Sequence, residues 1–198
     1  MGTMARESRR LSPGQVDTVL AAASRGEGWA FDALYRDFAP SVVGYLRAQD
    51  AWDPEDLSSE VFLAAFKGIT AFRGGDAEFR AWLFSIAHRR VIDDRRRRSR
   101  RVAEVGHNDV ASDPVSASDT ESLVIAGLEA ERLDRLCRQL SADQRDVILL
   151  RLVADLSLEE TARALGKSAG AVKALQRRGL QSLKTVLVGE IARGGVSR

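Results

Sequence analysis

The sequence has one cysteine and four prolines among 198 residues, and it has no long apolar run. Cys137 alone can form neither a disulfide framework nor a zinc cluster, so we expect a buried thiol in a reducing compartment. Because the sequence has no 18-residue apolar stretch and no signal-peptide core, we expect a cytoplasmic protein without a membrane span. Alternating Val, Ile and Thr runs are almost absent while helix-period patterns are long, and this predicts an all-α fold.

Signatures of catalysis are missing as well. The sequence contains no P-loop, no metal-ligand set and no nucleophile paired with a base. We therefore expect no enzymatic activity, no cofactor and no bound metal.

The charges are strongly segregated along the chain. A formal net charge of +2 conceals two basic blocks separated by an acidic one. Residues 102–122 lose helical periodicity and are rich in Ser, Asp and Ala, which is typical of a linker. His107 has no ligand partner there, and we interpret it as a solvated linker histidine. This segment would be repelled by DNA or could enter a basic channel in place of nucleic acid, because it carries acidic residues without basic ones: Glu104, Asp109, Asp113, Asp119 and Glu121.

The stretch from Ser157 to Leu183 is typical of a helix-turn-helix. Ser157 and Glu160 fit a capping box, Gly166 ends the first helix, and Ser168 is placed to cap the second. A single basic helix is more often a solvated face than a binding site. Between Thr161 and Gly189, however, basic residues occur without any Asp or Glu, which favours contact with nucleic acid. The outward face of the second helix is expected to carry Gly170, Lys173, Ala174, Arg177, Arg178, Gln181 and Lys184.

The N-terminal half predicts helices over 13–23 and 29–48, with Pro40 kinking or restarting the second. A third helix begins at Asp53, an N-cap followed by Pro54 at the first helical position. An exposed acidic row of Asp53, Asp56 and Glu60 has three interpretations: helix capping, a divalent-metal site, or a docking surface for a basic partner. Because histidines and an EF-hand spacing are missing, capping is favoured over metal.

A fourth helix, predicted from Ala77 to Arg97, changes character along its length. Its apolar stripe ends near Ala87, and arginines then occupy every side, which favours contact with a polyanion over a solvated tail. Phe84 and His88 lie off the apolar stripe. They could stack on unpaired bases or pack against a neighbouring helix.

Residues 123–140 and a helix capped by Ser141 and Gln144 precede the helix-turn-helix. Together these elements predict a four-helix C-terminal domain. The sequence thus predicts an all-α protein with two small domains joined by an acidic linker. The predicted boundaries are a tail at 1–13, a domain at 14–101, the linker at 102–122, a second domain at 123–190 and a tail at 191–198.

The sequence resembles a bacterial sigma factor of the extracytoplasmic-function class, group IV of the sigma-70 superfamily. The N-terminal half is similar to sigma domain 2 through DPEDLSSEVFLAAF and FRGGDAEFRAWLFSIAHRRVIDDRRRRSRR. The C-terminal half is similar to sigma domain 4 through LSADQRDVILLRLVADLSLEETARALGKSAGAVKALQRR. The order of these motifs, the linker between them and the total length make the resemblance specific, and it covers nearly all of residues 29–187.

The resemblance implies three binding surfaces. The acidic row together with Glu55, and with Leu57 and Phe62 behind it, corresponds to the surface that docks on core RNA polymerase, which selects docking over metal. The residues of this surface are Asp53, Glu55, Asp56, Leu57, Glu60 and Phe62. The next loop and helix correspond to the part that opens the minus-10 element: Arg73, Gly74, Gly75, Asp76, Arg80, Trp82, His88, Arg89, Arg96 and Arg97. The second helix of the helix-turn-helix corresponds to the minus-35 reader: Ser168, Gly170, Ala171, Lys173, Ala174, Arg177 and Arg178.

The resemblance also implies a role. We expect an initiation factor that binds core RNA polymerase and promoter DNA, with no small-molecule substrate, and that opens DNA by binding energy alone. An anti-sigma factor, often membrane-tethered in this class, is expected to restrain it at the inner membrane face. The sequence departs from the family pattern at Arg89, Ala171 and Ala174–Leu175, so no promoter sequence is transferred. The alternatives are a helix-turn-helix repressor or response regulator, which would not need the acidic row, and a metal-dependent nuclease.

Overall fold

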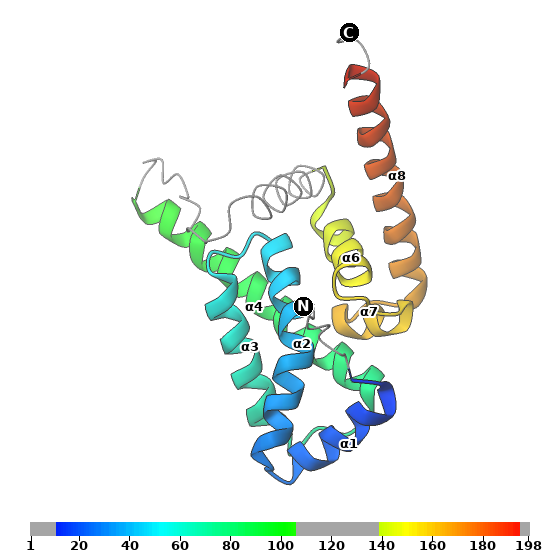
Figure 1. Ribbon diagram of the computed structural model, residues 1–198. Coiled ribbons are helices and arrows are strands. Elements are labelled where there is room, and N and C mark those ends of the chain that lie inside the picture. The colour runs from blue at the N-terminus through cyan, green and yellow to red at the C-terminus, as the bar shows by residue number, and fades with distance from the viewer. Residues whose placement is uncertain (1–10, 106–138, 195–198) are drawn as a thin grey trace, which may run out of the picture.

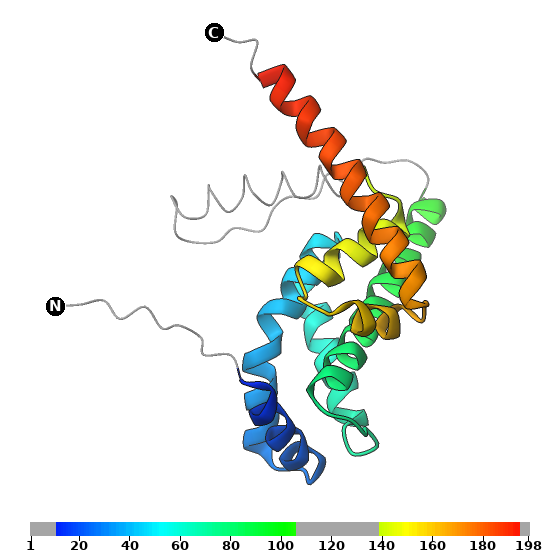
Figure 2. The same ribbon diagram turned by 90° about the vertical axis from the view of Figure 1, so that its right-hand side faces the viewer.

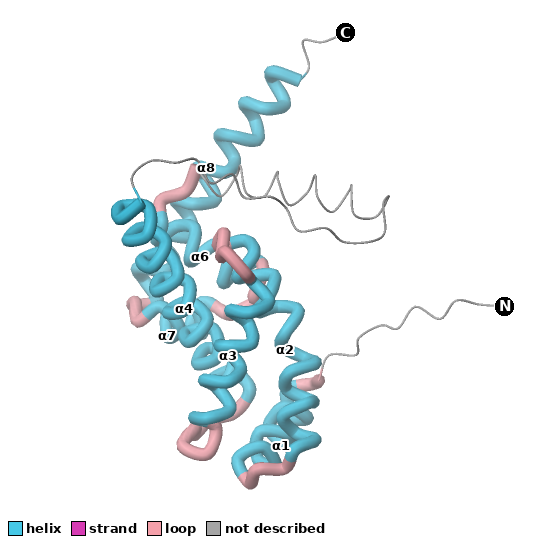
Figure 3. Tube along the Cα trace, turned by 90° about the vertical axis from the view of Figure 1, so that its left-hand side faces the viewer, coloured by secondary structure: helices cyan, strands magenta, loops and turns pink. Residues whose placement is uncertain are grey.

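A computed structural model describes residues 11–105 and 139–194 of the chain, and within these ranges every regular element is a helix (Figures 1 and 3). The helices are α1 (Pro13–Ser24), α2 (Gly28–Ala48), α3 (Pro54–Gly68), α4 (Asp76–Val105), α6 (Ala142–Leu152), α7 (Leu158–Leu165) and α8 (Ala169–Gly194). The all-α prediction is confirmed. No helix in this described part is both long and apolar enough to cross a lipid bilayer.

The N-terminal helices form a bundle in which α3 packs against both α2 and α4, and α1 packs against α2 (Figure 1). Its core is rich in aromatic residues. The rings of Phe38 and Phe79 meet edge to face with centroids 5.3 Å apart, and those of Tyr45 and Phe84 do so at 5.7 Å. Such pairs contribute about 0.5–1.5 kcal/mol each beyond their burial. The bundle therefore gives α3 and α4 a rigid support.

Two helices differ from their predicted form. Pro40 neither ends nor restarts α2, which is continuous from Gly28 to Ala48. The proline lies on the exposed side, where water can bond the carbonyl that loses its helical partner. Helix α4 continues to Val105 instead of ending near Arg97, because arginine is a good helix former even where no apolar stripe remains.

The C-terminal helices α6, α7 and α8 form the second domain. Val147, Ala162 and Val172, one from each helix, make its small core. Gly179 lets α8 approach α6 closely, since a Cβ there would lie 3.0 Å from Cγ1 of Ile148. Beyond this contact α8 extends away from the rest of the molecule (Figure 2). The predicted helix over 123–140 lies almost entirely outside the described residues.

The two domains share one apolar core. Leu149, Leu150 and Leu156 of the C-terminal domain are almost fully buried and belong to the same cluster as the core of the N-terminal bundle. Helix α7 lies on α4, and α6 touches α2. The sequence predicted two domains, but its local patterns contained no indication of this contact.

Candidate nucleic-acid and polymerase interfaces

The N-cap and the first two turns of α3 carry the predicted acidic row. An oxygen of Asp53 accepts a 2.9 Å hydrogen bond from the backbone N–H of Asp56, so the predicted helix cap is confirmed. Glu55 forms an ion pair with Arg47, and Glu60 lies 3.5 Å from Arg90. These pairs are partly exposed to solvent and leave the carboxylates of α3 on the surface.

Two apolar residues support this acidic face from behind. Leu57 and Phe62 are 4% and 2% exposed, and Phe62 also packs on Tyr35. They hold the helix in place but do not themselves form a surface. Among the described residues, no group of three or more His, Cys, Asp or Glu side chains is placed to hold a metal ion.

The loop before α4 has a backbone that requires glycine. Gly74 has φ +147°, and a Cβ there would lie only 2.5 Å from Cβ of Glu78. The backbone N–H of Gly75 donates to Glu78 at 3.1 Å, and this hydrogen bond is the main reason why the pKa of Glu78 lies below its ordinary value. The N–H of Asp76 donates to Asp17 at 2.8 Å, which ties the loop to α1.

The surroundings of Asp76, at the start of α4, disfavour its charged form. Burial is the main cause that raises its pKa, and the nearby carboxylates of Glu160, Asp17 and Asp37 act in the same direction. Arg80 partly offsets them. One carboxylate oxygen of Asp76 is buried without a hydrogen-bond partner among the described residues. A carboxyl group whose pKa is shifted by burial and by neighbouring charges marks a candidate functional site.

The predicted minus-10 residues do not form one exposed surface. Arg73 is exposed and caps the carbonyls of Thr70 and Phe72. Trp82 is half-buried and stacks on Phe72 with ring centroids 5.1 Å apart. Arg89 is exposed, and its Nε donates to the carbonyl of Ser85 at 3.2 Å.

Arg80 and His88 instead face the C-terminal domain. Arg80 donates to the carbonyl oxygens of Ala154 and Asp155 at 3.2 and 2.9 Å. His88 is 3.9 Å from the carboxylate of Asp146. Phe84, between them on α4, is 1% exposed and packs edge to face on the ring of Tyr45. In this structure Phe84 and His88 therefore pack against neighbouring helices, which was one of the two interpretations of their position, the other being stacking on unpaired bases.

The arginines at the end of α4 divide into two groups. Arg95 donates to the backbone and side-chain oxygens of Gln49 at 3.0 and 2.5 Å, and Arg98 donates to the carbonyl of Asp50. These two arginines hold the α2–α3 loop, in which Asp50 has φ +59°. Arg95 and Arg98 therefore have a structural role. The sequence could not distinguish them from the exposed arginines, because all of them lie in one continuous arginine-rich segment.

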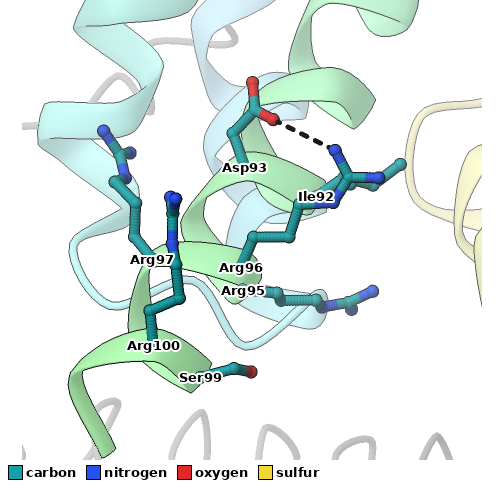
Figure 4. A pocket seen from close by; sticks show the side chains of 7 residues that line it. All are labelled: Ile92, Asp93, Arg95, Arg96, Arg97, Ser99 and Arg100. Carbon is teal, nitrogen blue, oxygen red and sulfur yellow. Dashed lines mark ion pairs between the residues drawn. The ribbon is translucent and has the colours of Figure 1, made fainter. Parts of the chain in front are cut away.

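The second group of arginines lines a pocket at the same end of α4. Arg96, Arg97 and Arg100 are exposed, and Arg96 is 4.0 Å from Asp93. Figure 4 shows Arg97 and Arg100 extending to the same side of the helix while Arg95 points elsewhere. The pocket is lined by Ile92, Asp93, Arg95, Arg96, Arg97, Ser99 and Arg100. Several guanidinium groups around one hollow are suited to phosphate oxygens.

The helix-turn-helix has the predicted geometry. The hydroxyl of Ser157 accepts from the N–H of Glu160 at 3.1 Å, while the Glu160 carboxylate accepts from the N–H of Ser157, which completes the capping box. Gly166 ends α7 in the left-handed region with φ +61°. The hydroxyl of Ser168 then accepts from the N–H of Ala171 at 3.2 Å and caps α8.

The outward face of α8 matches the predicted minus-35 surface. Val172 and Gly179 are buried on the opposite side of the helix, which confirms the predicted orientation. Ala174 is half-buried, and the other predicted residues are exposed: Ser168, Gly170, Ala171, Lys173, Arg177 and Arg178. A helix with this face and a tight preceding turn can enter the major groove of DNA.

Two features near the predicted sites were not found from the sequence. Trp52, in the loop before α3, is 62% exposed, and its N–H is 3.4 Å from a carboxylate oxygen of Asp94. Gln49 is fully buried beside Asp146, although both are polar. The position of Trp52 between Asp50 and Asp53 was a possible signal for the first feature. No local signal existed for the second, because its partners are 97 positions apart.

In the described residues, a helix-turn-helix and an arginine-rich helix occur together, a combination that is typical of DNA-binding proteins. The Sigma-70 region 2 family matches residues 34–101, and the Sigma-70, region 4 family matches residues 138–185. The chain is 33% identical to the ECF RNA polymerase sigma factor SigD of Mycobacterium bovis, with 88% of this chain and 84% of SigD covered. It therefore belongs to the ECF RNA polymerase sigma factors, proteins of transcription initiation.

Other relatives agree with this family. The chain is 35% identical to the ECF sigma factor BldN of Streptomyces coelicolor over 83% of its own length, and it spans 63% of BldN. The solved structure of CnrH in complex with the cytosolic domain of CnrY has a TM-score of 0.68 at 24% identity, covering 88% of this chain and 97% of CnrH. RpoE of Bartonella quintana, solved with the anti-sigma factor NepR, has a TM-score of 0.60 at 23% identity, covering 85% of this chain and 98% of RpoE. These two structures support the fold.

Proposed function

We propose that the chain is a group IV sigma factor with a polymerase-binding, minus-10-opening domain at residues 14–101 and a minus-35-reading domain at 123–190. The supporting observation is that acidic and basic side chains gather on different helices. Exposed carboxylates gather at the start of α3, whereas the outward face of α8 carries Lys173, Arg177 and Arg178. One surface suits a basic protein and the other suits DNA.

The acidic face of α3 is proposed to dock on core RNA polymerase. Asp56 and Glu60 supply charge for a basic partner, while Asp53 chiefly caps the helix. Leu57 and Phe62 act as positioning residues, since both are buried behind the carboxylates. Electrostatic complementarity of this kind increases the rate of association and selects the partner.

The helix α8 is proposed to read the minus-35 element in the major groove. Arg177 and Arg178 can contact phosphates or guanine edges, and Lys173 can contact phosphates. Gly170 and Ala171 leave little bulk between the helix and the base pairs. Ala174 is half-buried, and its small side chain permits close approach to DNA but offers no polar group to the bases.

The loop before α4 and the arginine end of α4 are proposed to open the minus-10 element. Gly74, Gly75 and Asp76 form a rigid turn beside Arg73, a shape that can receive an unstacked base. Arg89, Arg96 and Arg97, which are exposed, are proposed to hold phosphates along the helix. Extruding a base costs a few kcal/mol, which such contacts can offset without nucleotide hydrolysis.

Regulation by an anti-sigma factor is part of the proposal. CnrH was solved in complex with the cytosolic domain of CnrY, and RpoE was solved in complex with the anti-sigma factor NepR. We infer a comparable partner for this chain in the cytoplasm, and a membrane-tethered partner would hold it at the inner face of the membrane.

The test is run-off transcription with purified core RNA polymerase on a promoter library. The wild-type chain is expected to direct defined start sites. The double variant Asp56→Lys, Glu60→Lys is expected to bind core polymerase at least about tenfold more weakly, a loss of about 1.4 kcal/mol. Glu159→Lys is the matched control, because Glu159 is also an exposed carboxylate in the first turn of a helix but lies in the other domain.

Two results would contradict the proposal. Unchanged polymerase binding by the double variant, together with sequence-specific DNA binding by the chain alone, would favour a repressor. Metal-dependent cleavage of DNA by the isolated chain would favour a nuclease.

A further inference from the structure

The loop before α4 is held by a carboxylate from α1, a helix far away in the sequence. An oxygen of Asp17 accepts a 2.8 Å hydrogen bond from the backbone N–H of Asp76, although the two residues are 59 positions apart. This N–H lies at the start of α4, where the helix itself supplies no acceptor. A negative charge is also favourable at this end of a helix. Asp17 therefore caps a helix to which it does not belong.

Gly75 lets this carboxylate approach the loop. A Cβ on Gly75 would lie 2.9 Å from Oδ1 of Asp17, which is the same oxygen that accepts from Asp76. Real Cβ atoms do not approach other atoms so closely, so a side chain at this position would displace the carboxylate. The contact with Asp17 thus requires glycine at position 75, whereas Gly74 is required by its own positive φ.

Helix α1 gives Asp17 a firm support. Val16, beside Asp17 in the chain, is 1% exposed, and Leu20, about one turn later, is 5% exposed. Both belong to the core of the N-terminal bundle. Asp17 is therefore presented to the loop from a backbone that packing holds in place, which is what a positioning residue needs.

A second carboxylate also bonds to this loop. Glu78 accepts from the N–H of Gly75 at 3.1 Å, and its other oxygen lies 3.0 Å from a guanidinium nitrogen of Arg163 on α7. The pair with Arg163 belongs to the docked state, meaning the arrangement in which α7 packs on α4. The bond from Asp17, by contrast, joins the loop to a helix of the same bundle, so it does not depend on the C-terminal domain.

Helix α1 has so far been given no role beyond packing. It lies outside the residues that the Sigma-70 region 2 family matches, which begin at residue 34, and none of the three proposed binding surfaces includes it. A carboxylate repels the phosphates of DNA, so Asp17 is unsuited to contact the DNA backbone. It is suited to act on DNA through the loop that it holds.

We propose that Asp17 of α1 is a positioning residue for the choice of the minus-10 base, because it fixes the turn of Gly74, Gly75 and Asp76 in the shape that accepts the unstacked base. The inference rests on the proposed minus-10 role of this turn. A pocket for an extruded base selects by shape and by hydrogen bonds, and both depend on where its backbone lies. Without the bond from Asp17 the turn can take several shapes, which weakens binding of the preferred base more than binding of the others.

The test uses single-stranded oligonucleotides that carry the minus-10 element of a promoter selected by the wild-type chain. Four versions differ only at the base on which run-off transcription depends most. Fluorescence anisotropy measures their binding to the complex of the chain with core polymerase. Because the oligonucleotides are already unpaired, the measurement reports acceptance of the base and not opening of the duplex.

Asp17→Ala is expected to reduce the preference for the best base over the next best about fivefold, as the loss of one hydrogen bond predicts. Binding to core polymerase and to a minus-35 duplex is expected to stay within about twofold of wild type, since neither surface touches α1. Asp17 is exposed, so the melting temperature is expected to change little. A merely structural role would not change the choice of base while sparing these other properties.

Two variants serve as controls for Asp17→Ala. Asp17→Asn keeps an oxygen that can accept from the N–H of Asp76, so its preference is expected to stay within about twofold of wild type. Asp32→Ala removes an exposed carboxylate from α2 and is expected to leave the preference unchanged.

Gly75→Ala tests the contact from the side of the loop. Its methyl group displaces the carboxylate of Asp17, so the preference is expected to fall as it does in Asp17→Ala. In the double variant Asp17→Ala, Gly75→Ala the methyl group meets no carboxylate. The preference of the double variant is therefore expected to lie within about twofold of that of Asp17→Ala, because both changes break one contact.

Three results would overturn the inference and leave the proposed function intact. They are a wild-type preference in Asp17→Ala, an equal loss of preference in Asp17→Asn and Asp17→Ala, and losses that multiply in the double variant. A wild-type complex that binds all four oligonucleotides equally would also overturn the inference. If that complex directed no start site either, the proposed function would be overturned with it.

Discussion

The side-chain amide of Gln49 donates a 2.7 Å hydrogen bond to a carboxylate oxygen of Asp146, and this bond joins the end of α2 to α6. Gln49 is fully buried and Asp146 is 7% exposed. The bond ties the N-terminal bundle to the helix-turn-helix domain through two polar groups that are both buried. Its loss therefore leaves polar atoms buried without partners, which is more costly than loss of the bond alone.

Replacement of Asp146 is expected to loosen the contact between the domains. Asp146→Ala leaves the amide of Gln49 without its acceptor, which costs about 1–3 kcal/mol and lowers the melting temperature by several degrees. Asp146→Asn keeps an acceptor oxygen and is the matched control, with a smaller loss expected. Thermal unfolding followed by circular dichroism measures both. Equal melting temperatures for wild type and Asp146→Ala would show that the bond does not stabilise the docked state.

Acidification is expected to separate the domains through His88. Burial is the main cause that lowers the pKa of His88, Arg95 and Lys167 act in the same direction, and Asp146 and Asp143 oppose them. The docked state therefore favours neutral His88. Its stabilising effect is present above the ordinary histidine pKa of about 6.5 and is lost as the pH falls from there toward the lowered value.

The pH dependence can be measured by small-angle scattering of the wild-type chain between neutral and mildly acidic pH. The radius of gyration is expected to increase on acidification. His88→Gln retains a hydrogen-bonding side chain but cannot titrate, so its dimensions are expected to change less. An equal expansion of both proteins would assign the effect to other groups.

Trp52 is expected to contribute to polymerase binding. It is 62% exposed beside the acidic start of α3, and its loop is fixed by Arg98 and by the bond from its own N–H to Asp94. Exposed tryptophans on rigid surfaces often dominate interface energies. Trp52→Ala is expected to weaken core polymerase binding about tenfold, or about 1.4 kcal/mol, with little change in melting temperature. Trp29→Ala serves as a control, since Trp29 is 54% exposed at the start of α2. Equal losses from both variants would contradict a specific role for Trp52.

Local sequence patterns predicted the starts of α3, α6 and α7, the end of α7 and the orientation of α8, because these signals are short in range. Asp53 caps α3, Ser141 and Ser157 form capping boxes, and Gly166 adopts a positive φ, each within a few residues of its partner. The outward face of α8 followed from the burial of Val172 and Gly179 at helical spacing.

The contact between the domains could not be predicted in the same way. Arg80 finds its acceptors 74 and 75 positions later, and Gln49 finds Asp146 97 positions later. Nothing in the periodicity of either segment encodes such pairings. For the same reason the sequence could not separate the structural arginines Arg95 and Arg98 from the exposed Arg96 and Arg97.

Gly170 offers a test of the proposed minus-35 surface that separates binding from stability. A Cβ at this position meets nothing within 4 Å, and the residue lies in the first turn of α8. Gly170→Ala should therefore leave the fold intact or stabilise it by up to about 1 kcal/mol, because alanine loses less backbone entropy than glycine in a helix. The added methyl lies on the face that is proposed to enter the major groove. Minus-35 duplex binding, measured by fluorescence anisotropy, is expected to weaken several-fold although the melting temperature does not fall.

Gly179→Ala is the opposite control. Its Cβ would lie 3.0 Å from Ile148, so overpacking should lower the stability of the protein. Unchanged DNA binding by Gly170→Ala would place the base-reading contacts elsewhere on α8.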